Sequence, residues 1–382
     1  MTIFSVTAPA QTIFGRDSRL GAATHVARLG ARVLLVSGRS VPWVETFAAE
    51  LRALGLAVAR HYSAGEPSLG DVRDGVSAAR RFRAACVVAI GGGASIDLGK
   101  AIAGLAGSEG DPEEYLELGP APPRRLSNPL PFVAMPTTAG TGAEATRNAV
   151  ISLPEQQLKI SLRDPRLVPT LAIVDPALTD GLPKALTLAT GLDAITQLIE
   201  SYLCNRANPV SDALCRDTLP EAIAALRCLM EGPSEAARDT MARASYLSGL
   251  ALANSGLGVV HGLASVIGGR GGAHGAICGR LLADALHVNR EAAERAGLPA
   301  RRYDDVDGWL REGLGGADSG PECLRTFVDR RGLPTLRDLH LPESDFDAVA
   351  RAALGASSTK ANSVALSEGE IVQILLGAAR SL

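Results

Sequence analysis

The sequence predicts two domains, an α/β domain with a parallel sheet followed by an all-helical domain. Short apolar runs alternate with helical patterns as far as Leu178, and strand signals almost vanish from Leu186 onward. Long Ala/Leu-rich patterns such as DALCRDTLPEAIAALRCLM then take over. With 382 residues and 46% hydrophobic content, the chain can bury a large core, which two domains would share.

In the first domain, strands are expected to alternate with helices. The N-terminal stretch MTIFSVTAPAQTIFG alternates like a strand. Further apolar runs follow at residues 31–38, 56–63, 85–93, 130–138 and 171–178. Helical patterns precede or separate several of them, around residues 18–30 and 72–82. Strands separated by helices indicate a Rossmann-like parallel sheet, covered by helices on both faces.

The domain boundary is predicted within DPALTDGLPKAL, where Pro176, Gly181 and Pro183 interrupt regular structure. We therefore assign residues 1–178 to the α/β domain and residues 179–382 to the helical domain.

Composition excludes several classes of function. The net charge of −3 gives no basic field for nucleic acid, and an aromatic content of 4% gives little stacking surface. No run approaches the length of a membrane-spanning helix, and the N-terminus lacks the pattern of a signal peptide. The six scattered cysteines form no Cys-x-x-Cys pair, which indicates reduced thiols in the cytoplasm.

Two glycine-containing loops indicate a nucleotide site. AIGGGASIDLGKAIA (89–103) joins a strand, three glycines and a helix, so backbone N–H groups and the helix N-terminus can approach an anion. PTTAGTGAEAT (136–146) also follows a strand and offers hydroxyl groups. The first loop alone also fits a tight turn with no ligand. Two such loops on one sheet favour a dinucleotide, with its pyrophosphate.

The segment LLVSGRSV bears on the choice of dinucleotide. Gly38 stands where many dinucleotide folds carry a carboxylate for the ribose hydroxyls, and Arg39 and Ser40 follow it. Glycine leaves room for a 2′-phosphate and arginine can pair with it, so NADP is favoured over NAD. The alternative for Arg39 is an exposed loop charge.

A helix face in TGLDAITQLIES is polar without being basic. Asp193 and Gln197 lie four residues apart and project from one side, with Ser201 a turn further on. A solvated face is one interpretation. The other is that this face meets a cation, since it carries only carboxylate, amide and hydroxyl groups.

Two histidines lie in the glycine-rich segment GLGVVHGLASVIGGRGGAHGAICG (256–279). His261 is expected to end one helical segment and His274 to open the next. Imidazole is a common ligand for divalent metals, and carboxylate and amide oxygens can complete such a set. A histidine satisfied in the core remains the alternative for each.

Together these motifs resemble the iron-dependent (group III) alcohol dehydrogenases. GGGASIDLGKAIA and PTTAGTGAEAT are similar to that family's two cofactor loops. The family's linker between domains is similar to KISLRDPRLVPTLAIVDPALTDGLP. Its first ligand helix is similar to ATGLDAITQLIESYLCNRANPVSDAL, and its histidine region is similar to VVHGLASVIGGRGGAHGAICGRLL. The similarity extends to about Asn289 and weakens beyond it.

The resemblance implies a dinucleotide-binding domain and a helical domain with a divalent metal in the cleft between them, an architecture shared with dehydroquinate synthase. Asp193, His261 and His274 would be metal ligands and catalytic residues. The metal would be iron, with zinc as the alternative. The cofactor contacts expected from the loops and the resemblance are Gly38, Arg39, Ser40, Gly92, Gly93, Ala94, Ser95, Asp97, Thr137, Thr138, Thr141 and Lys159.

The sequence departs from the family at two positions. Gln197 stands where a third histidine ligand is typical, and it is expected to be the fourth metal ligand through its amide oxygen, which suits a harder ion but binds more weakly than imidazole. Ser265 stands where many members carry a histidine that could relay a proton.

The implied reaction is metal-assisted hydride transfer between NAD(P) and a small alcohol or aldehyde, an oxidoreductase activity on CH–OH groups. Three alternatives stay open: a metal-independent enzyme similar to maleylacetate reductases, a lyase of the dehydroquinate-synthase type, and a dinucleotide-binding protein whose metal site has decayed. Neither the substrate nor the oligomeric state follows from the sequence, a homodimer being one option.

Overall fold

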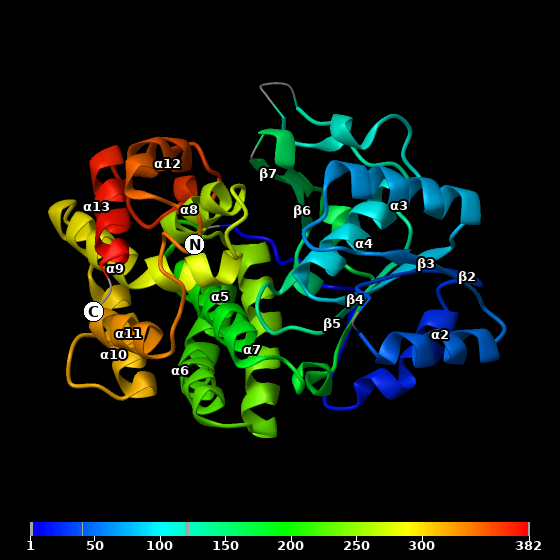
Figure 1. The fold of residues 1–382 in the computed structure, drawn as a ribbon, viewed down its shortest axis with the longest axis horizontal. Helices are drawn as coiled ribbons and strands as arrows, with labels where there is room; N and C mark the ends of the chain where they lie inside the picture. The colour runs from blue at the N-terminus through cyan, green and yellow to red at the C-terminus, as the bar shows by residue number, and fades with distance from the viewer. Residues whose placement is uncertain (1–2, 40, 119–121, 157, 381–382) are drawn as a thin grey trace. The chain divides into compact units, whose positions relative to one another are not determined.

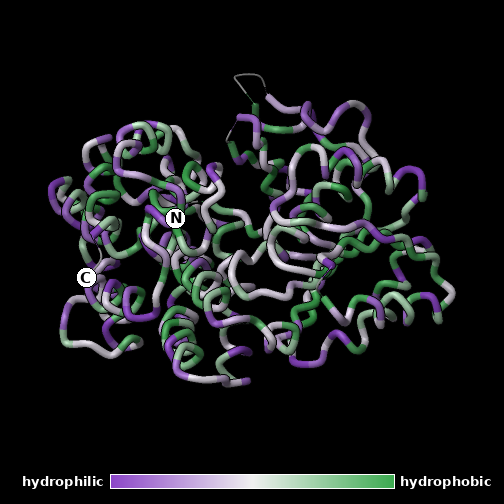
Figure 2. Tube along the Cα trace, in the orientation of Figure 1, coloured by the Kyte–Doolittle hydropathy of each residue, from purple (hydrophilic) through white to green (hydrophobic). Residues whose placement is uncertain are grey.

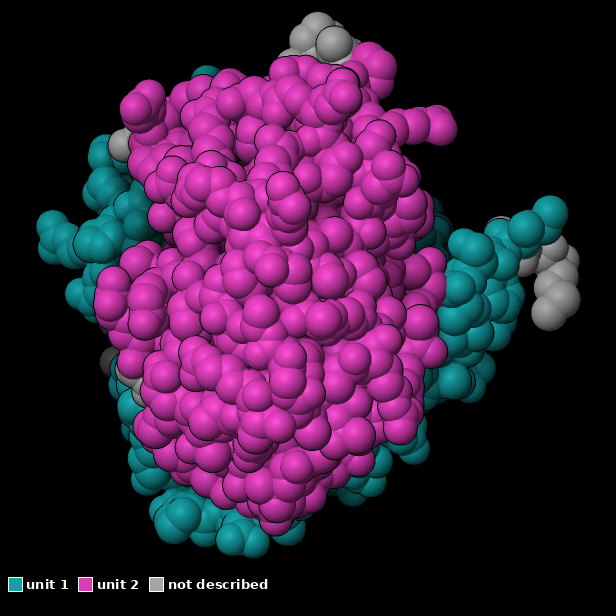
Figure 3. Space-filling model, turned by 90° about the vertical axis from the view of Figure 1, so that its right-hand side faces the viewer, with its two compact units in different colours: residues 1–6, 139–141, 182–382 teal, residues 7–138, 142–181 magenta. Residues whose placement is uncertain are grey.

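The computed structural model describes residues 3–39, 41–118, 122–156 and 158–380. The chain divides into two compact units, which Figure 3 colours separately. The sheet unit comprises residues 7–138 and 142–181, and the helical unit comprises residues 1–6, 139–141 and 182–382. The helical unit therefore includes a three-residue segment that lies within the sequence of the sheet unit.

A six-stranded sheet with parallel pairing forms the centre of the sheet unit, as predicted (Figure 1). Its order is β1-β8-β5-β4-β2-β3. The strands are β1 (Gln11–Phe14), β2 (Arg32–Ser37), β3 (Ala57–Tyr62), β4 (Cys86–Gly91), β5 (Phe132–Pro136) and β8 (Leu171–Val174). β4 and β5 are neighbours in the sheet, so their carboxyl ends bring the two predicted cofactor loops to the same edge.

Helices cover both faces of this sheet because side chains alternate along each strand. Leu34 and Val36 of β2 join one apolar cluster, while Val33 and Leu35 join another. The first cluster contains residues of α3 (Leu69–Phe82) and α4 (Gly93–Leu105), and the second contains residues of α1 (Ala22–Ala27) and α2 (Trp43–Ala53).

The sequence patterns did not predict a second, two-stranded sheet. β6 (Asn148–Leu153) pairs antiparallel with β7 (Leu158–Arg163). Alternate residues of β6 are buried, and Ala149 and Ile151 pack into the cluster that contains α4. The hairpin is stabilised by this long-range packing more than by its own short apolar pattern, which explains why periodicity did not indicate it.

The helical unit contains no strand among its described residues, in agreement with the predicted all-helical half. Its helices enclose an apolar cluster, and Figure 2 shows hydrophobic and hydrophilic segments alternating along them. α5 is buried along most of its length and packs against α6, α7 and α9. The helices are α5 (Lys184–Leu203), α6 (Pro209–Glu231), α7 (Glu235–Asn254), α8 (Val259–Gly268), α9 (His274–Arg295), α10 (Arg301–Leu314), α11 (Gly320–Arg330), α12 (Phe346–Leu354) and α13 (Glu368–Ala379).

No single helix in the described part of the chain is both long enough and apolar enough to cross a membrane. The helices α7 and α8 meet that criterion of length and composition only when they are taken together, and the chain bends by 102° between them.

Candidate metal centre

Helix α5 carries its polar stripe into the interior of the helical unit. Asp193, Gln197 and Glu200 occupy successive turns of one face and are 2%, 3% and 5% exposed. The solvated-face interpretation is therefore wrong for this helix. A buried carboxylate is costly without a charged or hydrogen-bonding partner, so the surroundings of Asp193 must supply one.

The two histidines reach Asp193 from different helices. His274 is the first residue of α9, as predicted. His261 is the third residue of α8, so the prediction that it ends a helix is wrong. The reason is the side chain of Glu200, whose Oε1 accepts the N–H of Val260 at 2.7 Å and whose Oε2 accepts the N–H of His261 at 3.3 Å. A carboxylate at this place satisfies N–H groups that a helix start leaves unpaired, and it favours a helix beginning at Val259.

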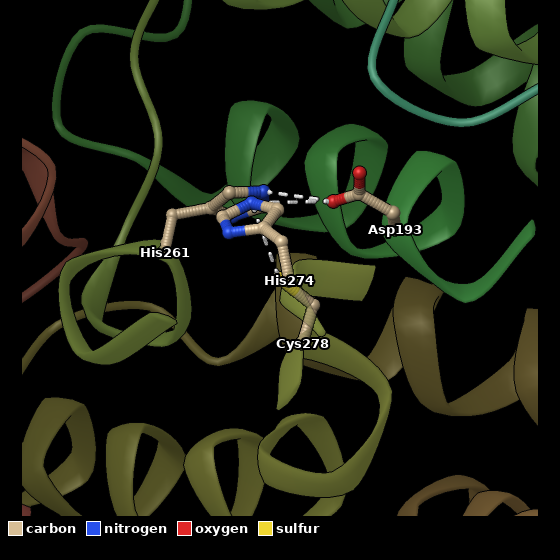
Figure 4. A group of neighbouring side chains, drawn as sticks. All are labelled: Asp193, His261, His274 and Cys278. Carbon is tan, nitrogen blue, oxygen red and sulfur yellow. Dashed lines mark hydrogen bonds and ion pairs between the residues drawn. The ribbon is translucent and has the colours of Figure 1, made fainter. Parts of the chain in front are cut away.

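Four donor atoms converge in this part of the helical unit (Figure 4). Nε2 of His261 lies 3.4 Å and Nε2 of His274 lies 3.7 Å from Oδ1 of Asp193. Sγ of Cys278 lies 3.8 Å from Nε2 of His274. All four ligand atoms lie within 4.8 Å of one another, a spacing that would suit a single metal ion.

Several buried polar atoms here lack a hydrogen-bond partner. They are Oδ1 of Asp193 and Nε2 of His261, together with Oε1 of Gln197, which lies one turn after Asp193 on α5. Buried polar groups are nearly always satisfied in folded proteins, so unsatisfied ones need an explanation. A divalent cation would interact favourably with a carboxylate oxygen, an imidazole nitrogen and an amide oxygen, and the donors therefore fit a metal ion.

The amide of Gln197 is held in one orientation. Its Nε2 donates to the backbone carbonyl of Gly140 at 3.0 Å. Gly140 lies so close to α5 that a Cβ atom there would stand 3.0 Å from the carbonyl oxygen of Thr190. Because the nitrogen is engaged, the unpartnered atom is the oxygen, the only atom of the amide that can ligate a metal.

Glu200 orients His261, a role that the sequence patterns did not predict. Its Oε2 lies 2.7 Å from Nδ1 of His261, which leaves Nε2 facing Asp193. A carboxylate on the far nitrogen of a ligating histidine fixes the ring and its tautomer. The available signal was spacing, because Glu200 follows Asp193 by seven residues on the same helix face.

Electrostatic interactions among Asp193, His261, His274 and Cys278 favour the charged forms of these side chains. Burial by itself would lower the pKa of His261, but Cys278 and Asp193 raise it well above its usual value. The pKa of His274 is raised against burial by the same two groups. Conversely, burial would raise the pKa values of Asp193 and Cys278, but the imidazoles lower both. Protons on the imidazoles would therefore compete with a metal ion for the same atoms.

In the sheet unit, the two glycine-containing loops adjoin. The N–H of Thr137 donates to the carbonyl of Gly91 at 2.9 Å. A Cβ atom on Gly92 would lie 3.3 Å from the Thr138 side chain, so glycine keeps this approach open. Gly93 and Ala94 begin α4, whose N-terminus has no side-chain cap. Its first N–H groups thus donate to no capping side chain, which is the condition that the predicted anion site requires.

The remaining expected cofactor residues have varied surroundings. Asp97 Oδ2 accepts the N–H of Val150 at 3.1 Å, and Lys159 Nζ lies 2.6 Å from Glu66. The guanidinium of Arg39 stacks 4.2 Å from the ring centroid of Tyr62. Gly38 has open space beside its Cα atom, Ser95 is buried, and Thr141 belongs to the helical unit. Ser40 lies outside the described residues.

A parallel sheet with an uncapped helix start, followed by a helical unit with a buried carboxylate–imidazole group, fits the class that the sequence motifs resemble, the two-domain, metal-containing dehydrogenases. Comparison with known proteins narrows this class. Residues 9–176 match the model of the iron-containing alcohol dehydrogenases, and residues 187–379 match the C-terminal model of the Fe-containing alcohol dehydrogenase family.

The chain is also similar to individual dehydrogenases over most of its length. The chain is 34% identical to the 1,3-propanediol dehydrogenase of Klebsiella pneumoniae, over 90% of each chain. It is 30% identical to the NAD-dependent methanol dehydrogenase of Bacillus methanolicus, over 99% of this chain and 100% of that one. A crystal structure of a 1,3-propanediol oxidoreductase superimposes with a TM-score of 0.88 at 31% identity, covering 99% of this chain and 100% of that chain. This chain belongs to the iron-containing alcohol dehydrogenase family and is an oxidoreductase acting on CH–OH groups.

Proposed function

We propose that the protein is a metal-assisted, NAD(P)-dependent dehydrogenase of small alcohols that also reduces the corresponding aldehydes. The observation that carries this proposal is the buried group around Asp193, where unpartnered oxygen and nitrogen atoms face one another. The names of the relatives, which refer to 1,3-propanediol and methanol, support a short primary alcohol as the substrate.

In this proposal, Asp193, His261 and His274 hold the ion, and the oxygen of Gln197 is a further donor. The ion would be iron, with zinc as the alternative, and when bound it would supply Lewis-acid polarisation of the substrate oxygen. The protein's own part is to place the donors and to exclude water from Asp193 and His261, which are at least nine-tenths buried. The nicotinamide cofactor would supply the hydride chemistry, as acceptor for an alcohol and donor for an aldehyde.

The cofactor would bind the sheet unit through its two loops. Gly92, Gly93 and Ala94 would offer backbone N–H groups to the pyrophosphate. Arg39 would pair with a 2′-phosphate beside Gly38, which makes NADP the favoured cofactor. A contact of Lys159 with the cofactor would first require its ion pair with Glu66 to open. The other proposed contacts are Ser95, Asp97, Thr137, Thr138 and Thr141.

Three further assignments belong to this proposal. Residues 1–178 act as the cofactor domain and residues 179–382 as the metal and substrate domain. The enzyme works in the cytoplasm on a small alcohol or aldehyde. It binds neither nucleic acid nor a membrane. A homodimer is the assembly to test first, by light scattering.

The variants Asp193→Ala and His274→Ala test the metal role. Both should lose bound metal and at least about a hundredfold in turnover, because each removes a donor from the ion that polarises the substrate. Elemental analysis and NADPH-linked assays of short aldehydes measure the two effects. His287→Ala is the matched control, since this histidine also lies on α9 but its side chain is 68% exposed. Full turnover in the first two variants would refute the metal role.

A further inference from the structure

Cys278 lies on the metal-facing side of α9, one turn after His274. Its side chain is completely buried, and Sγ lies 3.8 Å from Nε2 of His274. Figure 4 shows it on the same helix as His274, below the two imidazole rings. The thiol is therefore a neighbour of the proposed metal ligands and not only part of the surrounding apolar cluster.

Three of the distances among these donor atoms agree with a tetrahedral arrangement. Metal–nitrogen and metal–oxygen bonds of about 2.0–2.1 Å and a metal–sulfur bond of about 2.3 Å imply nitrogen–oxygen separations of about 3.4 Å and nitrogen–sulfur separations of about 3.6 Å. The structure has 3.4 Å and 3.7 Å between the imidazole nitrogens and Oδ1 of Asp193, and 3.8 Å between Nε2 of His274 and Sγ of Cys278. The other pairs of donor atoms lie within 4.8 Å, so side-chain movement would close the remaining gaps when all four atoms bind one ion.

A second observation supports a ligand at this place. Oδ1 of Asp193 and Nε2 of His261 are buried and have no hydrogen-bond partner, and both lie within 4.8 Å of the Cys278 sulfur. The sulfur therefore lies beside a carboxylate oxygen and an imidazole nitrogen that both lack hydrogen-bond partners. A cation among them would satisfy the carboxylate and the imidazole while taking the thiolate as a further donor.

We propose that Cys278 is a metal ligand, so that its thiolate with Asp193, His261 and His274 forms a four-donor site, and that its soft sulfur raises the affinity of the site for Zn²⁺ relative to Fe²⁺. This inference rests on the proposed function. On metal binding the sulfur forms a bond to the ion, and its proton is released to the solvent. Thiolate is a soft ligand that suits zinc, whereas the amide oxygen of Gln197 suits harder ions. Zinc sites can expand from four donors to five, so the set with Cys278 leaves a fifth position for the substrate oxygen when the Gln197 oxygen is not bound.

Cobalt substitution tests the sulfur bond directly. The metal-free protein is titrated with Co²⁺ alone, and its spectrum is recorded from the near ultraviolet to the visible. The wild type should show a thiolate-to-cobalt charge-transfer band that Cys278→Ser and Cys278→Ala both lack. Circular dichroism establishes that these variants fold, and having two of them guards against the misfolding of one. The matched control is Cys228→Ser, which removes an exposed thiol on α6 and should keep the band.

The outcomes separate the two proposals. The wild type could bind one cobalt ion and show its visible bands without a charge-transfer band. That result overturns the role of Cys278 and leaves the other ligands in place. A charge-transfer band that persists in Cys278→Ser also overturns it. A wild type that binds no cobalt overturns the metal site itself. In parallel competition experiments, the preference for Zn²⁺ over Fe²⁺ should fall about tenfold in Cys278→Ala, because a soft donor has been removed. An unchanged preference would contradict the metal selectivity.

Discussion

At the scale of the residue, Glu200 connects the start of a helix to the metal centre. One of its oxygens accepts the N–H of Val260, and the other approaches Nδ1 of His261. The same carboxylate thus fixes where α8 begins and which nitrogen of His261 faces Asp193. Its side chain is 6% exposed, so water provides little competition for either interaction.

Replacing Glu200 with glutamine should weaken metal binding more than it weakens folding. The neutral amide keeps the shape of the side chain but no longer raises the basicity of the imidazole. Metal affinity is expected to fall about 10- to 100-fold, the range found when such outer partners are changed. Competition with a coloured chelator measures the affinity.

The control for this variant is Glu291→Gln, which alters an exposed carboxylate 3.3 Å from His287 on α9. That pair lies in solvent, so its loss should leave metal affinity unchanged. Equal affinities in Glu200→Gln and the wild type would show that His261 needs no carboxylate to hold it.

At the scale of the element, the close packing of α5 and α9 sets the geometry of the ligands. Gly275 and Gly279 lie one turn apart on α9 and face α5. A Cβ atom on Gly275 would lie 2.3 Å from the carbonyl oxygen of Ala189, and one on Gly279 would lie 2.5 Å from the side chain of Leu192. Only glycine therefore allows the two helices to approach closely enough for His274 to reach Asp193.

Gly275→Ala should separate these helices. The clash is with backbone, which no rotamer change can relieve, so the free energy of unfolding should fall by about 1–3 kcal/mol. Metal binding should also weaken, because His274 precedes the substituted residue. Chemical unfolding and cobalt titration measure the two effects.

Gly308→Ala provides the comparison within a helix, since Gly308 lies in α10 with open space around its Cα atom. There the substitution should raise the free energy of unfolding by about 0.5–1 kcal/mol, because alanine loses less backbone entropy than glycine. Similar effects of the two variants would show that helix propensity, and not interhelical contact, governs both positions.

At the scale of the whole molecule, one buried acid links the stability of the fold to pH. Burial raises the pKa of Glu144 in the sheet unit to about 7, and the nearby Lys100 opposes this shift only in part. Lys100 itself is completely buried, and its Nζ donates to the carbonyls of Ala143, Thr146 and Asn148. Burial lowers its pKa to about 8.

The sign of the pH effect follows from the raised pKa of Glu144. The folded protein holds this proton more tightly than the unfolded chain, whose carboxyl titrates near 4.5. The stabilisation from Glu144 is therefore fully present below about pH 4.5 and is lost as the pH rises through about 7. Glutamine does not titrate, so Glu144→Gln should remove this pH dependence. The free energy of unfolding of the wild type should therefore fall relative to that of the variant as the pH rises from about 4.5 to about 7. Urea unfolding at several pH values measures it, and parallel curves for the two proteins would contradict it.

The sequence predicted the order of strands and helices better than it predicted their tertiary contacts. Local periodicity indicated the parallel sheet, and the resemblance indicated Asp193, His261 and His274. The β6–β7 hairpin and the true start of α8 depend on partners distant in the chain, such as α4 for the hairpin and Glu200 for His261. Periodicity carries no information about such partners, and neither does it show that Cys278 faces the histidines.

The segment 139–141 has a practical consequence for protein engineering. It is grouped with the helical unit although the residues on both sides of it belong to the sheet unit, and its Gly140 carbonyl holds the amide of Gln197. A recombinant fragment or chimera that starts at residue 182 would inherit the glutamine without its anchor. Its amide would be free to flip, so any exchange of catalytic halves between relatives must carry this tripeptide along.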